Sequence, residues 1–190
     1  MKYRSGRVVG IFGLPCSGKS TLAKAITQAS KELIAHVSTG DIARRLSTAK
    51  ETQHMAEGNL FPDEDKIRAE MLDMVNKRRS QGSEIIILDS CPRFDDQVKW
   101  MVENQLVGVD PSDGCLIKVI GDDLIRRAQE RMRDDQDQLI QLNKKIEKHS
   151  LMIEQMEALI FRYGIPYYTV VNHEMAQAVK EFAKYLGLRK

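Results

Sequence analysis

A glycine-rich segment near the start of the chain has the residue types and spacing of a phosphate-binding loop. Residues 13–21 read GLPCSGKST and fit the pattern G-x-x-x-x-G-K-[ST], directly after an apolar run that predicts a strand. In such a loop, backbone N–H groups surround phosphate oxygens, and the N-terminus of the next helix adds partial positive charge. We expect Lys19 to reach the β- and γ-phosphates of a nucleotide and the Ser20 hydroxyl to bind Mg²⁺. The residues predicted to bind the nucleotide are Gly13, Pro15, Cys16, Ser17, Gly18, Lys19, Ser20 and Thr21.

A carboxylate follows a second apolar run. Residues 85–88 read IIIL and are followed by Asp89, a position typical of the aspartate beside the metal ion in phosphate-binding-loop enzymes. Ligands of open α/β sheets gather at the carboxyl ends of the strands, so Asp89 and the loop are expected to meet. Many strands end in Asp as a turn signal, so this assignment depends on the loop. We predict that Ser20 and Asp89 bind the metal.

The remaining sequence predicts the elements that would position these residues. Short apolar runs alternate with longer helical patterns, which is typical of an α/β fold with a parallel sheet covered by helices. Strands are predicted at residues 8–12, 33–37, 84–88, 115–120 and 167–171. Helices are predicted at residues 19–29, 63–79, 95–105 and 174–186, with a long helical region at 122–162. Residues 40–79 contain no strand pattern, so we expect a small helical insert over the sheet edge.

Length and composition restrict the classes of protein. The 190 residues fit one domain, residues 1–190, and carry 29 basic against 27 acidic side chains. This balance argues against a protein built mainly to bind nucleic acid. Cys16, Cys91 and Cys115 are too far apart for a zinc motif or a disulfide framework. No window approaches the ~20 apolar residues of a membrane span, and the short apolar run at residues 8–13 does not fit a signal peptide. We therefore expect a cytoplasmic protein without a membrane partner.

A heptad-like seam runs through residues 139–160. Its members, spaced alternately by three and four residues, are Leu139, Leu142, Ile146, His149, Ile153, Met156 and Ile160. One interpretation is a coiled-coil seam that joins two copies of the chain. The other is a long helix in a monomer that packs one stripe on the sheet. We favour the second, because His149 interrupts the seam and the sheet needs a cover.

Four motifs in order resemble the nucleoside monophosphate kinases, among which the adenylate kinases are most similar. They are the phosphate-binding loop, HVSTGDIAR at residues 36–44, GNLFPD at residues 58–63, and LDSCPR at residues 88–93 with Gln97. The resemblance covers residues 7–133. It implies a five-stranded parallel sheet, a helical insert at residues 40–79 that binds the monophosphate, and a lid.

The same resemblance implies roles for single residues. Arg44 and Arg93 would bind the acceptor phosphate, since guanidinium groups meet phosphate oxygens in pairs. Thr39 and Gln97 would contact the base, and both are adenine-type residues in this family. The full set of predicted monophosphate-binding residues is Thr39, Gly40, Arg44, Asn59, Leu60, Phe61, Ser90, Arg93 and Gln97. Thr39 could instead be a helix N-cap alone, and Arg44 part of a solvated helix face.

A cluster of arginines follows the fourth predicted strand. Arg127 and Arg131 are four residues apart and would share one face of a helix. In the family, such a pair points at the transferred phosphoryl group. A very short lid is expected at residues 127–135. The predicted catalytic residues are Lys19, Arg93, Arg127, Arg131 and Arg133. The alternative is a surface charge cluster.

The sequence also departs from the family pattern. Ser90 and Cys91 replace Gly and Phe, and Asn143 stands where many members carry another arginine. We therefore expect an altered acceptor pocket and altered lid chemistry.

The predicted function is transfer of the γ-phosphoryl group of ATP to a nucleoside monophosphate, with Mg²⁺ as cofactor and AMP as acceptor. One alternative is a small-molecule hydroxyl kinase on the same scaffold, with Asp41 or Asp89 as general base. The other is a non-catalytic, nucleotide-dependent protein that dimerises through the seam.

Overall fold

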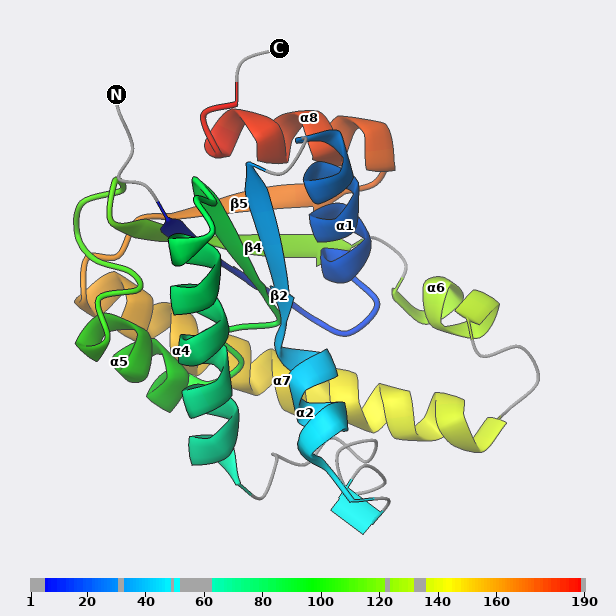
Figure 1. Cartoon of the computed structure of the whole chain (residues 1–190). Coiled ribbons are helices and arrows are strands. Elements are labelled where there is room, and N and C mark those ends of the chain that lie inside the picture. The colour runs from blue at the N-terminus through cyan, green and yellow to red at the C-terminus, as the bar shows by residue number, and fades with distance from the viewer. Residues whose placement is uncertain are drawn as a thin grey trace.

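The computed structural model describes residues 6–30, 33–48, 50–51, 63–121, 124–131 and 136–188, without the side chains of residues 128, 131 and 136–139. Five parallel strands form one sheet in the order β2-β3-β1-β4-β5 (Figure 1). The strands are β1 (Arg7–Phe12), β2 (Ile34–Ser38), β3 (Ile85–Asp89), β4 (Gly114–Gly121) and β5 (Tyr167–Asn172). This confirms the predicted fold class, and each predicted strand lies within one residue of its observed bounds.

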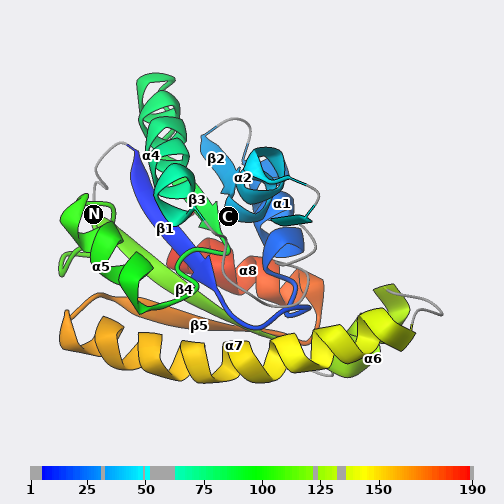
Figure 2. The ribbon, with the colours of Figure 1, turned by 90° about the horizontal axis from the view of Figure 1, so that it is seen from below.

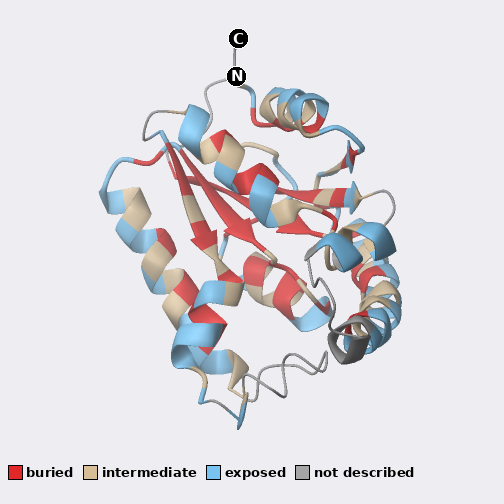
Figure 3. Cartoon of the chain, turned by 90° about the vertical axis from the view of Figure 1, so that its right-hand side faces the viewer, coloured by how far each residue is buried: buried red, intermediate tan, exposed pale blue. Residues whose placement is uncertain are grey.

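Helices cover both faces of the sheet (Figures 1 and 2). The bounds are α1 (Lys19–Ala29), α2 (Thr39–Leu46), α4 (Glu64–Ser80), α5 (Asp95–Glu103), α6 (Leu124–Arg131), α7 (Gln136–Arg162) and α8 (Met175–Tyr185). One core unites the sheet with α1 and α8. The other unites the opposite face with α2, α4, α5 and α7. Most strand residues between them are buried, as Figure 3 shows. β1 and β3 are buried at every position, whereas the edge strand β5 is buried only at Val170 and Asn172. Strands covered on both faces read as continuous apolar runs, which is why the sequence predicted them well.

The long region predicted as helical at residues 122–162 contains two helices, α6 and α7. In α7, Ile153, Met156 and Ile160 are buried in the core that covers one face of the sheet, whereas Leu142 is buried beside the pocket. These three seam positions therefore pack against the chain's own sheet, which favours the helix that covers the sheet, and the monomeric state stays a prediction.

The part of the predicted insert that the structure describes is helical. Helix α2 begins after the N-cap Ser38, whose side chain accepts a hydrogen bond from the Asp41 N–H, and it packs on α4. Asp63 caps α4 in the same way through the Lys66 N–H. Ser38, at the end of β2, thus turns the chain directly into α2 at the edge where the phosphate-binding loop lies. Among the described residues, no helix is both long enough and apolar enough to cross a membrane.

Candidate functional site

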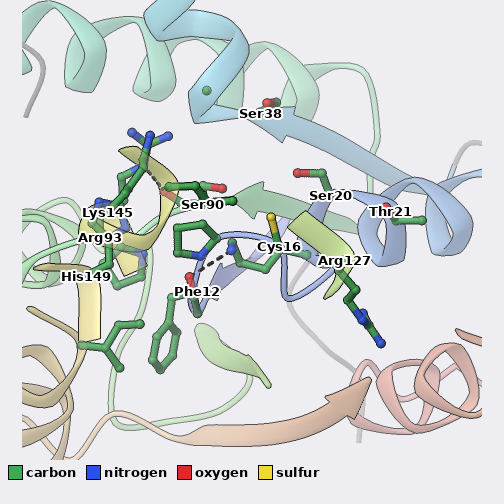
Figure 4. Close-up of a pocket in the computed structure, with 18 of the residues that line it drawn as sticks. Phe12, Cys16, Ser20, Thr21, Ser38, Ser90, Arg93, Arg127, Lys145 and His149 are labelled. Carbon is green, nitrogen blue, oxygen red and sulfur yellow. Dashed lines mark hydrogen bonds between the residues drawn. The ribbon is translucent and has the colours of Figure 1, made fainter. Parts of the chain in front are cut away.

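A pocket of about 810 Å³ opens where the carboxyl ends of the strands meet α1, α2 and α7 (Figure 4). Its volume lies within the ~300–1,000 Å³ range of ligand pockets. One wall is the phosphate-binding loop with the start of α1. The opposite wall is formed by α2 and the loop after β3, and α7 closes a third side. From the predicted nucleotide-binding set, the lining residues are Gly13, Pro15, Cys16, Gly18, Lys19, Ser20 and Thr21, and Ser17 is buried behind them.

Two glycines allow the loop to curve against the sheet. Gly13 has φ 142°, and a Cβ atom there would lie 2.3 Å from the Val119 carbonyl oxygen. Gly18 has φ 92°, and a Cβ atom there would lie 2.1 Å from Asn172 Nδ2. Glycine is the residue that accepts both the backbone angle and the close approach. The N-cap of α1 is Gly18, so no cap side chain accepts a hydrogen bond from the first N–H groups of the helix. These N–H groups can donate to an anion.

Lys19 lies inside the curve of the loop. Its Nζ donates to the carbonyl oxygens of Gly13 and Leu14 at 2.9 and 2.6 Å, and contacts Ser17 Oγ at 3.4 Å. The ammonium group is therefore held beside the concave face on which a phosphate would bind. Phosphate binding by Lys19 stays a prediction, and this location favours it.

Asn172 fixes the loop from behind, and we did not single it out in the sequence. Its Nδ2 donates to the Ser17 carbonyl oxygen at 2.9 Å, and the residue is almost fully buried. The backbone carbonyl oxygen of Asn172 accepts a hydrogen bond from Arg127 Nη2. The position directly at the end of β5 was the one signal that could have found it, because strand ends converge on this edge. Arg127, which is held by this hydrogen bond to Asn172, lines the pocket.

Asp89 lies at the end of β3 with 1% of its side chain exposed. Oδ2 is 3.3 Å from His36 Nε2, and Oδ1 accepts from Ser90 Oγ at 3.2 Å. Burial would raise the pKa of Asp89, but hydrogen bonds from His36 and Ser20, together with the charge of Lys19, hold it below its usual value. The carboxylate is therefore ionised at neutral pH.

The donor set at this point fits Mg²⁺ bound together with phosphate. No group of three or more His, Cys, Asp or Glu side chains within the described part of the chain could hold a metal. Mg²⁺ typically takes only one or two protein ligands and completes its shell with phosphate oxygens and water. A hydroxyl from Ser20 and the ionised Asp89 carboxylate meet that requirement. Metal binding by Ser20 and Asp89 stays a prediction, and this donor set is compatible with it.

Two arginines converge on the opposite wall. A Cβ atom at Gly40 would lie 3.5 Å from Arg44 Nη1 and 3.6 Å from Arg93 Nη2, so both guanidinium groups lie above the start of α2. Arg93 is anchored by its Nε, which donates to the Ser90 carbonyl oxygen at 3.1 Å, and Arg44 pairs with Asp41. Burial lowers the pKa of Arg93, yet a guanidinium stays charged in proteins. Two guanidinium groups side by side can both donate hydrogen bonds to the oxygens of one phosphate.

Thr39 and Gln97 lie behind this wall rather than on it. Each has 1% of its surface exposed, and neither lines the pocket. Gln97 Oε1 accepts from the Arg93 backbone N–H at 2.8 Å, and its Nε2 donates to Glu64 Oε2 at 3.2 Å. Thr39 Oγ1 donates to Met71 Sδ at 3.3 Å. In this structure Gln97 orders the Arg93 loop, and base contact by Gln97 or Thr39 stays a prediction.

Helix α7 contributes two polar residues that we did not single out as phosphate ligands. Lys145 and His149 line the pocket on the face that begins with Leu142, whereas Asn143 is exposed and lies outside the lining. Burial lowers the pKa of Lys145, and the charges of Arg93 and Arg44 lower it further. The spacing of Leu142, Lys145, His149 and Ile153 is that of one helix face, which was the available signal.

The remaining predicted residues are only partly described. Asn59, Leu60, Phe61 and Arg133 lie outside the described residues, and Arg131 is described in its backbone alone, as the last residue of α6. Ser90 lines the pocket with φ 63°, in the left-handed region. The neighbouring Cys91 points into the core against Met101, and burial raises the pKa of its thiol to about 12. Cys91 is therefore a packing residue.

A family model described as an AAA domain matches residues 12–143. The chain belongs to this AAA-domain family. The matched segment begins at the end of β1 and includes the phosphate-binding loop, the three arginines that line the pocket and the first part of α7.

Curated relatives of this AAA-domain chain carry the name adenylate kinase. The protein from Salinibacter ruber is 32% identical over 131 residues, which is 65% of this chain and 58% of the relative. A Helicobacter pylori protein is 34% identical over 95 residues, or 47% of this chain and 48% of the relative. One from Nitratiruptor is 27% identical over 162 residues and 82% of each chain. The chain thus spans between about half and three fifths of the length of the first two. These relatives confirm the resemblance to the adenylate kinase-like nucleoside monophosphate kinases.

Proposed function

We propose that the protein transfers the γ-phosphoryl group of ATP to a nucleoside monophosphate. The observation that carries the proposal is that one pocket places a phosphate-binding loop opposite a pair of arginines. The loop with Lys19 suits the polyphosphate of the donor, and Arg44 with Arg93 suits the single phosphate of the acceptor. The names of the relatives point to the same reaction.

The chemistry needs positioning and neutralised charge rather than covalent help. The second pKa of a monophosphate is near ~6, so its attacking oxygen is already largely anionic at neutral pH. Two polyanions must therefore be brought together against their repulsion. Lys19, Arg44, Arg93, Arg127 and Lys145 all line the pocket and supply that neutralisation. A Mg²⁺ ion held by Ser20 and Asp89 would add charge stabilisation on the phosphate oxygens.

Transfer to a hydroxyl acceptor would require a general base, and the two candidate carboxylates are already engaged. Asp89 is buried and forms hydrogen bonds with the side chains of His36 and Ser90. Asp41 is exposed, pairs with Arg44, and has a pKa lowered chiefly by that hydrogen bond. A carboxylate with a lowered pKa is a weak base. This arrangement favours a phosphate acceptor over a hydroxyl acceptor.

We expect AMP to be the preferred acceptor, because Thr39 and Gln97 are the adenine-type residues of the family that the chain resembles. A base site built for one hydrogen-bonding edge disfavours bases that lack it, so kcat/KM for AMP should exceed that for CMP or UMP roughly tenfold or more. A coupled assay with MgATP and a panel of AMP, dAMP, GMP, CMP and UMP measures this directly. Equal or higher kcat/KM with a pyrimidine nucleotide would contradict the adenine preference, while transfer to none of the panel would contradict the proposed function.

A further inference from the structure

His149 is a titratable group inside the pocket that the proposed reaction does not yet use. It lies on α7, one helical turn after Lys145, and its side chain is half-buried. Figure 4 shows Lys145, Arg93 and His149 gathered on one side of the pocket, away from Arg127 and Thr21. An imidazole at this place borders the space between the phosphate-binding loop and the arginine pair.

Within the described part of the chain, the charged groups that lower the pKa of His149 come from three elements and are all positive. They are Lys145 and Lys148 on α7, Arg93 in the loop after β3, and Lys19 at the start of α1. Among the described residues that line the pocket there is no carboxylate. Burial first, and then these cations, lower the pKa of His149 to about 4. The imidazole is therefore neutral at physiological pH while the pocket holds no anion.

We propose that His149 takes up a proton from solvent when nucleotide phosphates enter the pocket, and then binds them as an imidazolium. Phosphates bring several negative charges into the cationic site, which reverses the sign of the field at the imidazole. Only a proton moves, from the buffer to a ring nitrogen, and no bond to phosphorus changes in this step. The inference rests on the proposed function, because the phosphates are those of its nucleotides.

The sign of the pH dependence follows from linkage. The bound state has the higher His149 pKa and holds more protons, so ATP affinity should rise as the pH falls from about 6.5 towards 4. A pKa restored to its ordinary value of about 6.5 gives an uptake of roughly three quarters of a proton at about pH 6 and almost none at about pH 8. Protonation changes on ATP itself are common to wild type and variants, so the difference between proteins isolates His149.

Isothermal titration calorimetry of MgATP in two buffers of different ionisation enthalpy measures this uptake. At about pH 6, the proton uptake on MgATP binding should be smaller in His149→Gln than in wild type by roughly three quarters of a proton. His173→Gln is the matched control, since His173 is exposed and lies outside the pocket lining. Its uptake should equal that of wild type. At about pH 8 all three proteins should agree.

A second measurement uses wild-type protein alone and does not depend on how the variant folds. The Cε1–H proton resonance of His149, assigned as the one missing from the variant, should titrate near pH 4 without ATP and at or above about 6.5 with it. This inference would be overturned if MgATP binds with equal proton uptake in wild type and His149→Gln, or if the His149 resonance titrates at the same pH with and without ATP. Either result would leave the proposed function standing. Failure of wild type to bind MgATP would overturn both.

Discussion

Replacing Lys19 with Met is expected to remove phosphoryl transfer almost completely while the protein stays folded. The ammonium group lies on the concave face of the phosphate-binding loop and would stabilise charge on the transferred group. Loss of one such group lowers kcat by about 100- to 1,000-fold. Met keeps the length of the side chain, and the residue is only half-buried, so the melting temperature should change by a few degrees at most.

Steady-state kinetics and thermal melting of the same preparation test this result. The matched control is Lys184→Met, because Lys184 is exposed on α8 and lies outside the pocket lining. Its kcat should equal that of wild type. A folded Lys19→Met enzyme with near wild-type turnover would contradict the assignment of this loop as the donor site.

The second large effect is expected at Arg93. Replacing it with Met removes one of the two guanidinium groups above Gly40 but keeps the apolar stem of the side chain. A hydrogen bond to a charged group contributes about 1.5–3 kcal/mol, so kcat/KM for the acceptor should fall roughly 10- to 150-fold. The KM for ATP should change little, because the donor loop lies on the opposite wall.

Initial rates with either substrate varied separate these two constants. Arg45→Met is the matched control, since Arg45 follows Arg44 on α2 but is exposed and pairs with Glu70 outside the pocket. It should leave both constants unchanged. An Arg93→Met enzyme that loses ATP affinity and keeps its acceptor KM would show that this wall binds the donor.

The parts of the site fixed by local sequence were predictable. A helix that opens at Lys19 after this loop is specified by the residues themselves, because Gly13 and Gly18 adopt the positive φ angles that the turn requires and that other residues rarely adopt. The strands were predictable for a related reason. Their apolar runs are continuous because both faces are covered, as in β3, and Asp89 follows directly at the pocket edge.

The parts fixed by tertiary packing were not predictable in the same way. The resemblance singled out Asn143 as the position where many family members carry an arginine, whereas in this structure the register of α7 on the sheet turns Lys145 and His149 into the pocket. Asn172 lies far from the loop in sequence and meets it only because β5 and β1 flank β4 in one sheet. Gln97 was predicted on residue type, but its amide is engaged by Arg93 and Glu64. Such partners depend on how separate elements are brought together.

Product analysis by ³¹P NMR distinguishes phosphoryl transfer to AMP from transfer to water. Wild-type protein is incubated with MgATP and AMP, and the phosphorus signals of ATP, ADP, AMP and inorganic phosphate are followed together. We expect that ATP and AMP decline at the same rate, that ADP appears at twice that rate, and that inorganic phosphate stays at background. Release of inorganic phosphate with AMP unchanged would contradict this expectation and would assign the pocket to nucleotide hydrolysis.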